Sequence, residues 1–162
     1  MDDKIKQEFT RRIKNATPMQ LIVINYELLL FFMDEASAAA ARMPECVAAL
    51  ESARAALSEL HASLDMDIEF SKDLGNLYLY VNKCLIHAGM RRTNDEKNAL
   101  LSDARGIVAE LHKAWQTLDS DDGLYERLLG ENSQKIFAGL TYGKDGRLEE
   151  FQDFNPDGGY KA

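Results

Sequence analysis

The sequence predicts an all-α protein: an antiparallel four-helix bundle with an additional short N-terminal helix and an irregular C-terminal tail. Apolar residues recur three and four positions apart through five segments up to Leu118, and only three prolines interrupt the chain. Four long helices with short connections bury such apolar seams best as antiparallel neighbours. We therefore expect a helical bundle domain over residues 1–130 and an extended or loosely structured tail over residues 131–162.

The first helix is expected over residues 3–14. Ile5, Phe9 and Ile13 stand four apart and form one apolar stripe, while the remaining positions are mainly charged. A short helix of this kind packs across an end or a groove of a bundle. The stripe would then act either as an N-terminal lid over a binding groove or as a permanent cap, and the sequence leaves both open.

The second helix begins with Thr17-Pro18-Met19-Gln20, in which Thr17 caps, Pro18 suits the first helical position and Gln20 completes a capping box. It ends between residues 38 and 42. Two apolar stripes predict that this helix is central in the bundle, lines a groove, or does both. The stripes are Leu21, Ile24, Leu28 and Phe31, and Ile22, Leu29, Phe32 and Ala36.

The third and fourth helices carry alternating four- and three-residue spacings, which are typical of antiparallel helix packing. The third begins at Pro44 and ends at residues 65–67, and Arg91 and Arg92 favour the C-terminal end of the fourth. The seams are Cys46, Leu50, Ala53, Leu57, Leu60 and Leu64, and then Phe70, Leu74, Leu77, Val81, Cys84 or Leu85, and Ala88.

A second capping box, from Thr93 to Glu96, opens the fifth helix, which extends to Leu118. Gly106 inside this helix costs about 1 kcal/mol relative to alanine, so it marks either a close helix approach or simple tolerance. The tail is rich in glycine and turn residues. Its two short apolar runs, 136–142 and 148–154, allow a loose hairpin, but an extended tail is favoured.

Composition excludes several classes of function. The net charge of −8 argues against nucleic-acid binding, which depends on basic residues. The charged N-terminus lacks the apolar core of a signal peptide, and the most apolar stretch, residues 21–33, is too short to insert into a membrane. Cys46 and Cys84 have no metal-binding or redox spacing, so we expect buried thiols in a reducing, cytoplasmic protein.

No motif for catalysis or for a cofactor is found. The chain has no phosphate-binding loop, no glycine-rich dinucleotide turn and no Glu-x-x-His pair for a di-iron centre. His61 and Asp65 are four apart and a metal site there is conceivable, but a solvent-facing pair is the favoured interpretation. We therefore expect no enzyme activity, no cofactor and no metal.

Three blocks of the sequence together resemble the FliS family of flagellin export chaperones. Each is a short helical motif, and their order and separation match the family over roughly residues 9–118. The blocks are Asn15-Ala16-Thr17-Pro18 with the apolar helix after it; Glu59-Leu60-His61-Ala62-Ser63-Leu64-Asp65 with Leu74, Leu77, Tyr78 and Tyr80; and Glu110-Leu111-His112-Lys113-Ala114-Trp115.

The resemblance implies a chaperone that binds the disordered C-terminal segment of flagellin, prevents premature polymerisation and assists its delivery to the flagellar export apparatus. An amphipathic helix of flagellin would lie in an apolar groove of the bundle. The alternative is a helical adaptor or regulator with another protein partner, and homodimerisation is left open. The candidate groove residues are Leu21, Asn25, Leu28, Leu64, Phe70, Leu74, Leu77, Tyr78 and Val81, and Phe137, Leu140, Tyr142 and Phe151 of the tail are candidates for occluding it.

Overall fold

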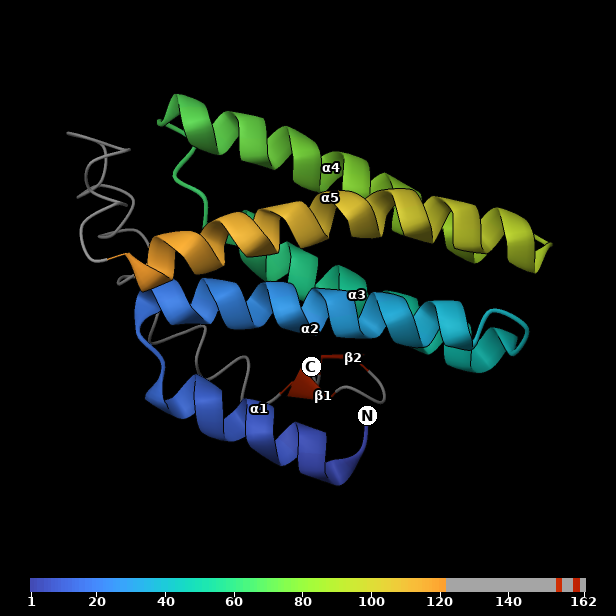
Figure 1. Ribbon diagram of the computed structural model, residues 1–162. Helices are drawn as coiled ribbons and strands as arrows, with labels where there is room; N and C mark the ends of the chain where they lie inside the picture. Colours follow the sequence, from blue (N-terminus) through green and yellow to red (C-terminus); the bar gives the residue numbers. More distant parts are fainter. Residues whose placement is uncertain (122–153, 156–158, 161–162) are drawn as a thin grey trace.

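The computed structural model describes residues 1–121 and the short segments 154–155 and 159–160. Its helices are α1 (Asp3–Asn15), α2 (Pro18–Ala38), α3 (Met43–Ala62), α4 (Glu69–Met90) and α5 (Asn94–Ser120). From α2 to α5 each helix packs against the next, and α5 returns to pack against α2 (Figure 1). The short connections make consecutive helices antiparallel, so the predicted four-helix bundle with an extra N-terminal helix is confirmed.

Two short strands lie at the end of the tail. β1 (Phe154–Asn155) pairs with β2 (Gly159–Tyr160) in antiparallel register, with Phe154 opposite Tyr160, and β2 lies against α3. This pairing occurs beyond the two apolar runs considered for a hairpin. The run at 136–142, nearly all of the run at 148–154 and the expected domain boundary at residue 130 lie outside the described residues.

The helix caps follow the sequence signals closely. The Thr17 hydroxyl accepts a hydrogen bond from the Gln20 amide at 3.2 Å, and the Gln20 side chain accepts one from the Thr17 amide at 3.0 Å, so the first capping box is complete. At α5 the Thr93 hydroxyl accepts from the Glu96 amide at 3.2 Å. That hydrogen bond is half of the second predicted box and is enough to begin the helix.

The two apolar faces of α2 have separate partners. One stripe is fully buried in the bundle, with Leu29 and Phe32 at 0 % exposure. The other stripe turns outward and packs against α1, where the rings of Phe9 and Phe31 meet edge to face at 6.4 Å. This double burial explains why α2 is apolar nearly all round.

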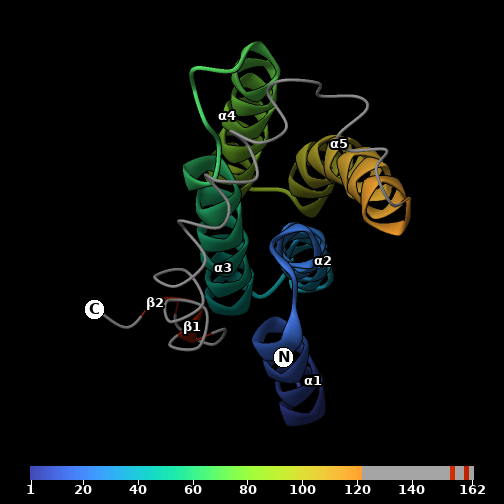
Figure 2. The same cartoon turned by 90° about the vertical axis from the view of Figure 1, so that its left-hand side faces the viewer.

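The N-terminal helix lies along α2, on the side of the bundle away from α4 (Figure 2). Ile13 is buried at its C-terminal end, and Arg12 forms an ion pair with Glu27 at 2.5 Å. At its N-terminal end the Met1 amino group lies 3.1 Å from the Glu35 carboxylate. α1 and α2 therefore form an antiparallel hairpin, and α1 runs beside the bundle instead of across one of its ends.

A chain of polar aromatic side chains crosses the interior. The hydroxyls of Tyr26 on α2 and Tyr78 on α4 are 2.5 Å apart, and the Trp115 side chain on α5 forms a hydrogen bond with Tyr26. The His61 ring of α3 meets the Tyr78 ring edge to face at 6.2 Å. Burial raises the pKa of both tyrosines, that of Tyr78 to about 12. All four bundle helices contribute to this chain.

Lys97 joins the start of α5 to the connection between α2 and α3. Its side chain is 2 % exposed, and its ammonium group donates a hydrogen bond to the Ala40 carbonyl at 2.9 Å and contacts the Met43 sulfur at 2.9 Å. A cation is favoured beside the carboxyl end of α2, where backbone carbonyls are left without helical partners. This contact holds the end of the bundle opposite the tyrosine pair.

The tyrosine pair predicts a loss of stability at alkaline pH. The unfolded chain releases a tyrosine proton near pH 10, whereas folded Tyr78 keeps it to about pH 12. Stability is therefore complete below pH 10 and should fall above it, by about 1.4 kcal/mol per pH unit for each such tyrosine. Urea unfolding at pH 9, 10 and 11 measures this slope. Tyr78→Phe should flatten it, and an unchanged slope in that variant would contradict the assignment.

Gly106 predicts a gain in stability on substitution. A Cβ atom at this position would meet nothing within 4 Å, so the glycine reflects tolerance and not a close helix approach. Gly106→Ala should raise the free energy of unfolding by about 1 kcal/mol, because alanine has the higher helix propensity. The exposed Ala99 of the same helix is the matched control, since Ala99→Gly should lower it by a similar amount. A destabilised Gly106→Ala variant, measured by urea unfolding, would refute this explanation.

Candidate functional site

The nine predicted groove residues do not form one continuous surface. The first three lie on α2, and the others lie on α4 or on the connection that leads into it. Most of these side chains point into the bundle, so the predicted set contains core residues as well as surface residues. Asn25, Leu28, Leu74, Tyr78 and Val81 are buried, Leu21 and Leu64 are partly buried, and Phe70 and Leu77 are exposed.

Four of the nine meet around a small cavity at one end of the bundle. Leu64, Phe70, Leu74 and Tyr78 line it, together with side chains from the start of α2 and the end of α5, including Trp115. The free space is about 20 Å³, enough for about one water molecule. The cavity therefore cannot enclose a ligand, but it leaves Phe70 at its rim, where the side chain is 41 % exposed.

Exposed apolar side chains continue along α4 from this rim. Phe70, Leu77 and Tyr80 are 41, 38 and 47 % exposed and stand seven and three residues apart, which places them on one side of the helix. Tyr80 lies beside Cys84 and Asp103, which both raise its pKa, and Asp103 belongs to α5. This side of α4 therefore faces α5, and we call Phe70, Leu77 and Tyr80 the α4–α5 surface.

The rim of the α4–α5 surface is acidic. Asp73 stands three residues beyond Phe70, and Asp103 and Glu110 are exposed on the neighbouring α5. The surface accordingly combines an apolar strip with nearby carboxylates. It suits an apolar helical stripe flanked by basic or neutral residues, because an acidic partner would be repelled.

A second exposed strip, which the sequence analysis missed, lies on the opposite side of α4. Leu79, Ile86 and Met90 are 55, 38 and 74 % exposed, and Met43 and Val47 of α3 continue the strip at 44 and 37 %. We call these five residues the α3–α4 face. Leu79 and Ile86 stand seven residues apart in the sequence, which is a signal for a shared helix face, but the spacing is weaker than that of the neighbouring seam from Phe70 to Ala88.

The predicted lid lies apart from both strips. Along α1, Ile13 is buried, Phe9 is partly buried against α2 and Ile5 is 37 % exposed. Because α1 follows α2 on the side away from α4, these side chains do not cover the α4–α5 surface (Figure 2). The tail candidates for occlusion, Phe137, Leu140, Tyr142 and Phe151, lie outside the described residues.

The described residues bring together little reactive chemistry. Both cysteines are free and buried, as expected, and burial raises the pKa of the Cys46 thiol. No group of three or more potential metal ligands is found within this part of the chain. None of its helices combines the length and the apolar character needed to cross a bilayer. What the described structure offers to a partner is therefore a set of apolar surfaces.

Comparison with known proteins agrees with the family resemblance carried by the three helical blocks of the sequence. Residues 1–122 match the family model described as flagellar protein FliS. No curated protein and no solved structure matches the chain significantly. The matched region includes all five helices of the described structure and ends immediately after α5. The chain therefore belongs to the FliS family of flagellar proteins.

Proposed function

We propose that this protein is a cytoplasmic flagellar export chaperone that binds the C-terminal segment of flagellin on the α4–α5 surface. Membership of the FliS family supports the general role. The observation that carries the specific proposal is the exposed strip of Phe70, Leu77 and Tyr80, which continues from the small cavity at the end of the bundle. Holding the segment there would keep it from polymerising before delivery to the export apparatus.

The physical basis is burial of apolar surface by a segment that folds as it binds. A disordered segment loses conformational entropy when it becomes helical, so its contact must bury a large apolar area. Aromatic and aliphatic side chains exposed along one side of α4 supply such an area. The acidic rim favours a segment whose apolar stripe is flanked by basic or neutral residues, which adds selectivity. Binding of this kind requires neither catalysis nor a cofactor.

The N-terminal helix completes the proposal as a displaceable lid over α2. Only Ile13 of α1 is buried, and α1 is otherwise held by the Phe9–Phe31 ring contact and by ion pairs at its edges. A helix of this length is marginal by itself, so a partner can displace it at modest cost. Flagellin would then reach the outer stripe of α2, where Leu21 and Leu28 lie.

The proposal predicts weaker flagellin binding when the α4–α5 surface is interrupted. Leu77→Ser should lower the affinity for flagellin, because a central apolar contact is worth about 1–3 kcal/mol of binding free energy. The ligand is a peptide of about the last forty residues of flagellin, a length suited to a segment that folds as it binds. Calorimetric titration should show one-to-one binding with a negative heat-capacity change. Ile86→Ser is the matched control, since Ile86 is also 38 % exposed on α4 but faces α3.

Two outcomes of that titration would reject the proposal. Equal loss of affinity in both variants would place flagellin elsewhere on α4. Absence of binding by the intact protein, with its helices verified by circular dichroism, would favour the alternative of an adaptor with another partner.

The lid predicts that a weakened α1 contact strengthens binding. Phe9→Ala removes the ring contact with Phe31, which is worth about 1 kcal/mol. If flagellin displaces α1, the affinity measured in the same titration should rise by up to about fivefold. Lys14→Ala, at an exposed position of α1, should leave the affinity unchanged. Unchanged affinity in Phe9→Ala, accompanied by lower stability, would identify α1 as a permanent cap.

A further inference from the structure

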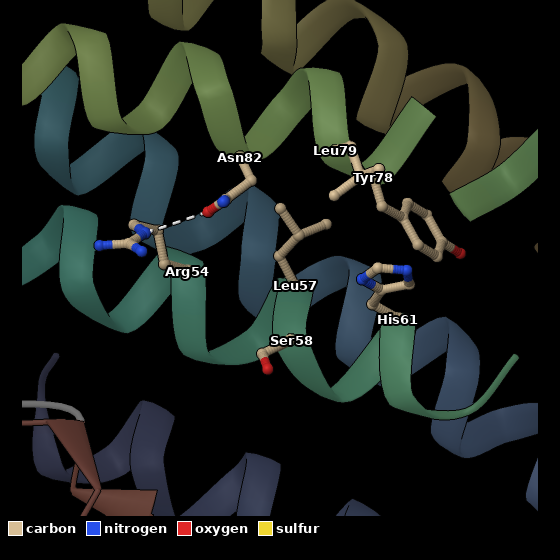
Figure 3. Close-up of a pocket in the computed structure, with 7 residues that line it drawn as sticks. All are labelled: Arg54, Leu57, Ser58, His61, Tyr78, Leu79 and Asn82. Atoms are coloured by element: carbon tan, nitrogen blue, oxygen red, sulfur yellow. Dashed lines mark hydrogen bonds between the residues drawn. The ribbon is translucent and has the colours of Figure 1, made fainter. Parts of the chain in front are cut away.

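A hollow between α3 and α4 opens beside the α3–α4 face (Figure 3). Its space amounts to about 160 Å³, several times what one water molecule needs. Leu57 and Leu79 form an apolar wall, and Leu79 is also a member of the α3–α4 face. The other side chains that line the hollow are polar: Arg54, Ser58, His61, Tyr78 and Asn82. The hollow therefore joins an exposed apolar strip to a cluster of hydrogen-bonding groups.

Arg54 is exposed at one end of this hollow and has no ion-pair partner within the described part of the chain. Its Nε atom donates a hydrogen bond to the side-chain oxygen of Asn82 at 3.0 Å. This bond uses one of the five guanidinium donors and orients the group, so the two terminal amino groups stay available for a ligand. Ion pairs with carboxylates already occupy four other arginines: Arg11, Arg12, Arg42 and Arg105.

The lining of the hollow offers hydrogen-bond donors without a competing carboxylate. None of the seven residues that the structure places along it is acidic. The Ser58 hydroxyl and the His61 ring can each donate a hydrogen bond, whereas the Tyr78 hydroxyl is already paired with Tyr26. An ionised carboxylate has acceptor atoms alone, and it accepts two parallel hydrogen bonds from an arginine. The lining therefore favours an anionic ligand.

The charges around the hollow favour an anion with a single negative charge. Exposed Glu51 precedes Arg54 by one helical turn on α3. Exposed Lys83 follows Asn82 on α4, so two cations and one anion leave one net positive charge. A phosphate group carries about 1.5 to 2 negative charges near pH 7 and would be neutralised only in part. A carboxylate attached to apolar groups matches both the charge and the apolar wall.

Apolar side chains lie on both sides of this cation along the bundle. The hydrogen bond between Arg54 and Asn82 brings these two positions to the same level of α3 and α4. Leu79 lies about one helical turn before that level on α4, and Ile86 lies about one turn, or roughly 6 Å, beyond it. Both are exposed, at 55 and 38 %. A helical ligand with an acidic residue inside its apolar stripe has the same spacing of groups.

We propose that the hollow binds the carboxylate of an aspartate or glutamate on a helical segment of a partner protein, with the apolar residues of that segment on the α3–α4 face. The acidic rim of the α4–α5 surface would repel such a segment, so the two sides of α4 accept different ligands. The inference therefore does not rest on the proposed function. A single helix covers less area than a standard interface, so we expect a dissociation constant of about 0.1 mM.

Two synthetic peptides test the site on the full-length protein. Both are helical, about 18 residues or five turns long, with leucine at three- and four-residue spacing in a neutral polar background. One has a central glutamate, and the other has glutamine at that position. The glutamate peptide should bind about fivefold more tightly, because a carboxylate accepts charge-assisted hydrogen bonds from the guanidinium group. It should also shift the NMR signals of the Arg54 Nε–H and the Asn82 side-chain amide. Equal affinities would overturn the proposal.

Variants of the same chain separate the carboxylate contact from the apolar contact. Arg54→Gln should abolish the preference for the glutamate peptide. Arg92→Gln is the matched control, because it removes the same charge from an exposed arginine just beyond the end of α4 and should keep the preference. Ile86→Ser should weaken both peptides equally and leave their ratio unchanged. A preference that survives Arg54→Gln would place the carboxylate elsewhere and contradict the assignment.

Two further titrations test other occupants of the hollow. Inorganic phosphate should leave the Arg54 and Asn82 signals in place, and a saturable shift would assign the hollow to a free oxyanion and reject the proposal. The tail of this chain offers carboxylates of its own, which the triple variant Glu149→Gln, Glu150→Gln and Asp153→Asn removes. That variant should bind the glutamate peptide with unchanged affinity. Binding seen in the triple variant alone would identify the tail as the occupant and would also reject the proposal. Flagellin titration is a separate measurement, so the two proposals can fail independently.

Discussion

The hydrogen-bonded chain from Trp115 through Tyr26 to Tyr78 is the constraint on which the rest of the bundle depends. Three helices supply its polar atoms, and α3 adds the His61 ring. A buried hydroxyl without a partner costs about 1–3 kcal/mol, so α2, α4 and α5 must adopt the rotation and level at which these groups meet. The rotation of α4 in turn determines which of its apolar residues remain exposed.

That rotation leaves apolar side chains on both sides of α4. One strip faces α5 beside carboxylates, and the other lies on the side of α4 next to α3. A helix that served only the core would bury one stripe and expose polar residues elsewhere. The overall charge of −8 opposes nonspecific association of such a surface. α4 therefore contributes to the core and also presents exposed apolar side chains on two of its sides.

The sequence located the region of the candidate site more reliably than its individual residues. Phe70 and Leu77 are exposed, but Tyr78 and Asn25, which were candidates for the same groove, are buried. The hydroxyl of Tyr78 reaches Tyr26, which is 52 positions away in the chain. No local sequence pattern reveals a partner at that distance. Helical periodicity also cannot distinguish an apolar stripe that faces the core from an exposed apolar stripe next to it on the same helix.

The sequence by itself determined the five helices, most of their ends and the class of fold, because caps, prolines and apolar spacing act within a few residues of one another. The third helix, expected to end at residues 65–67, ends at Ala62. The sequence also carried the blocks typical of the FliS family. Only the tertiary structure decided that α1 lies along α2, that Gly106 faces open space, and that Lys97 closes the end of the bundle. These features depend on contacts between distant segments, whose geometry is set by packing of the whole bundle and not by local preference.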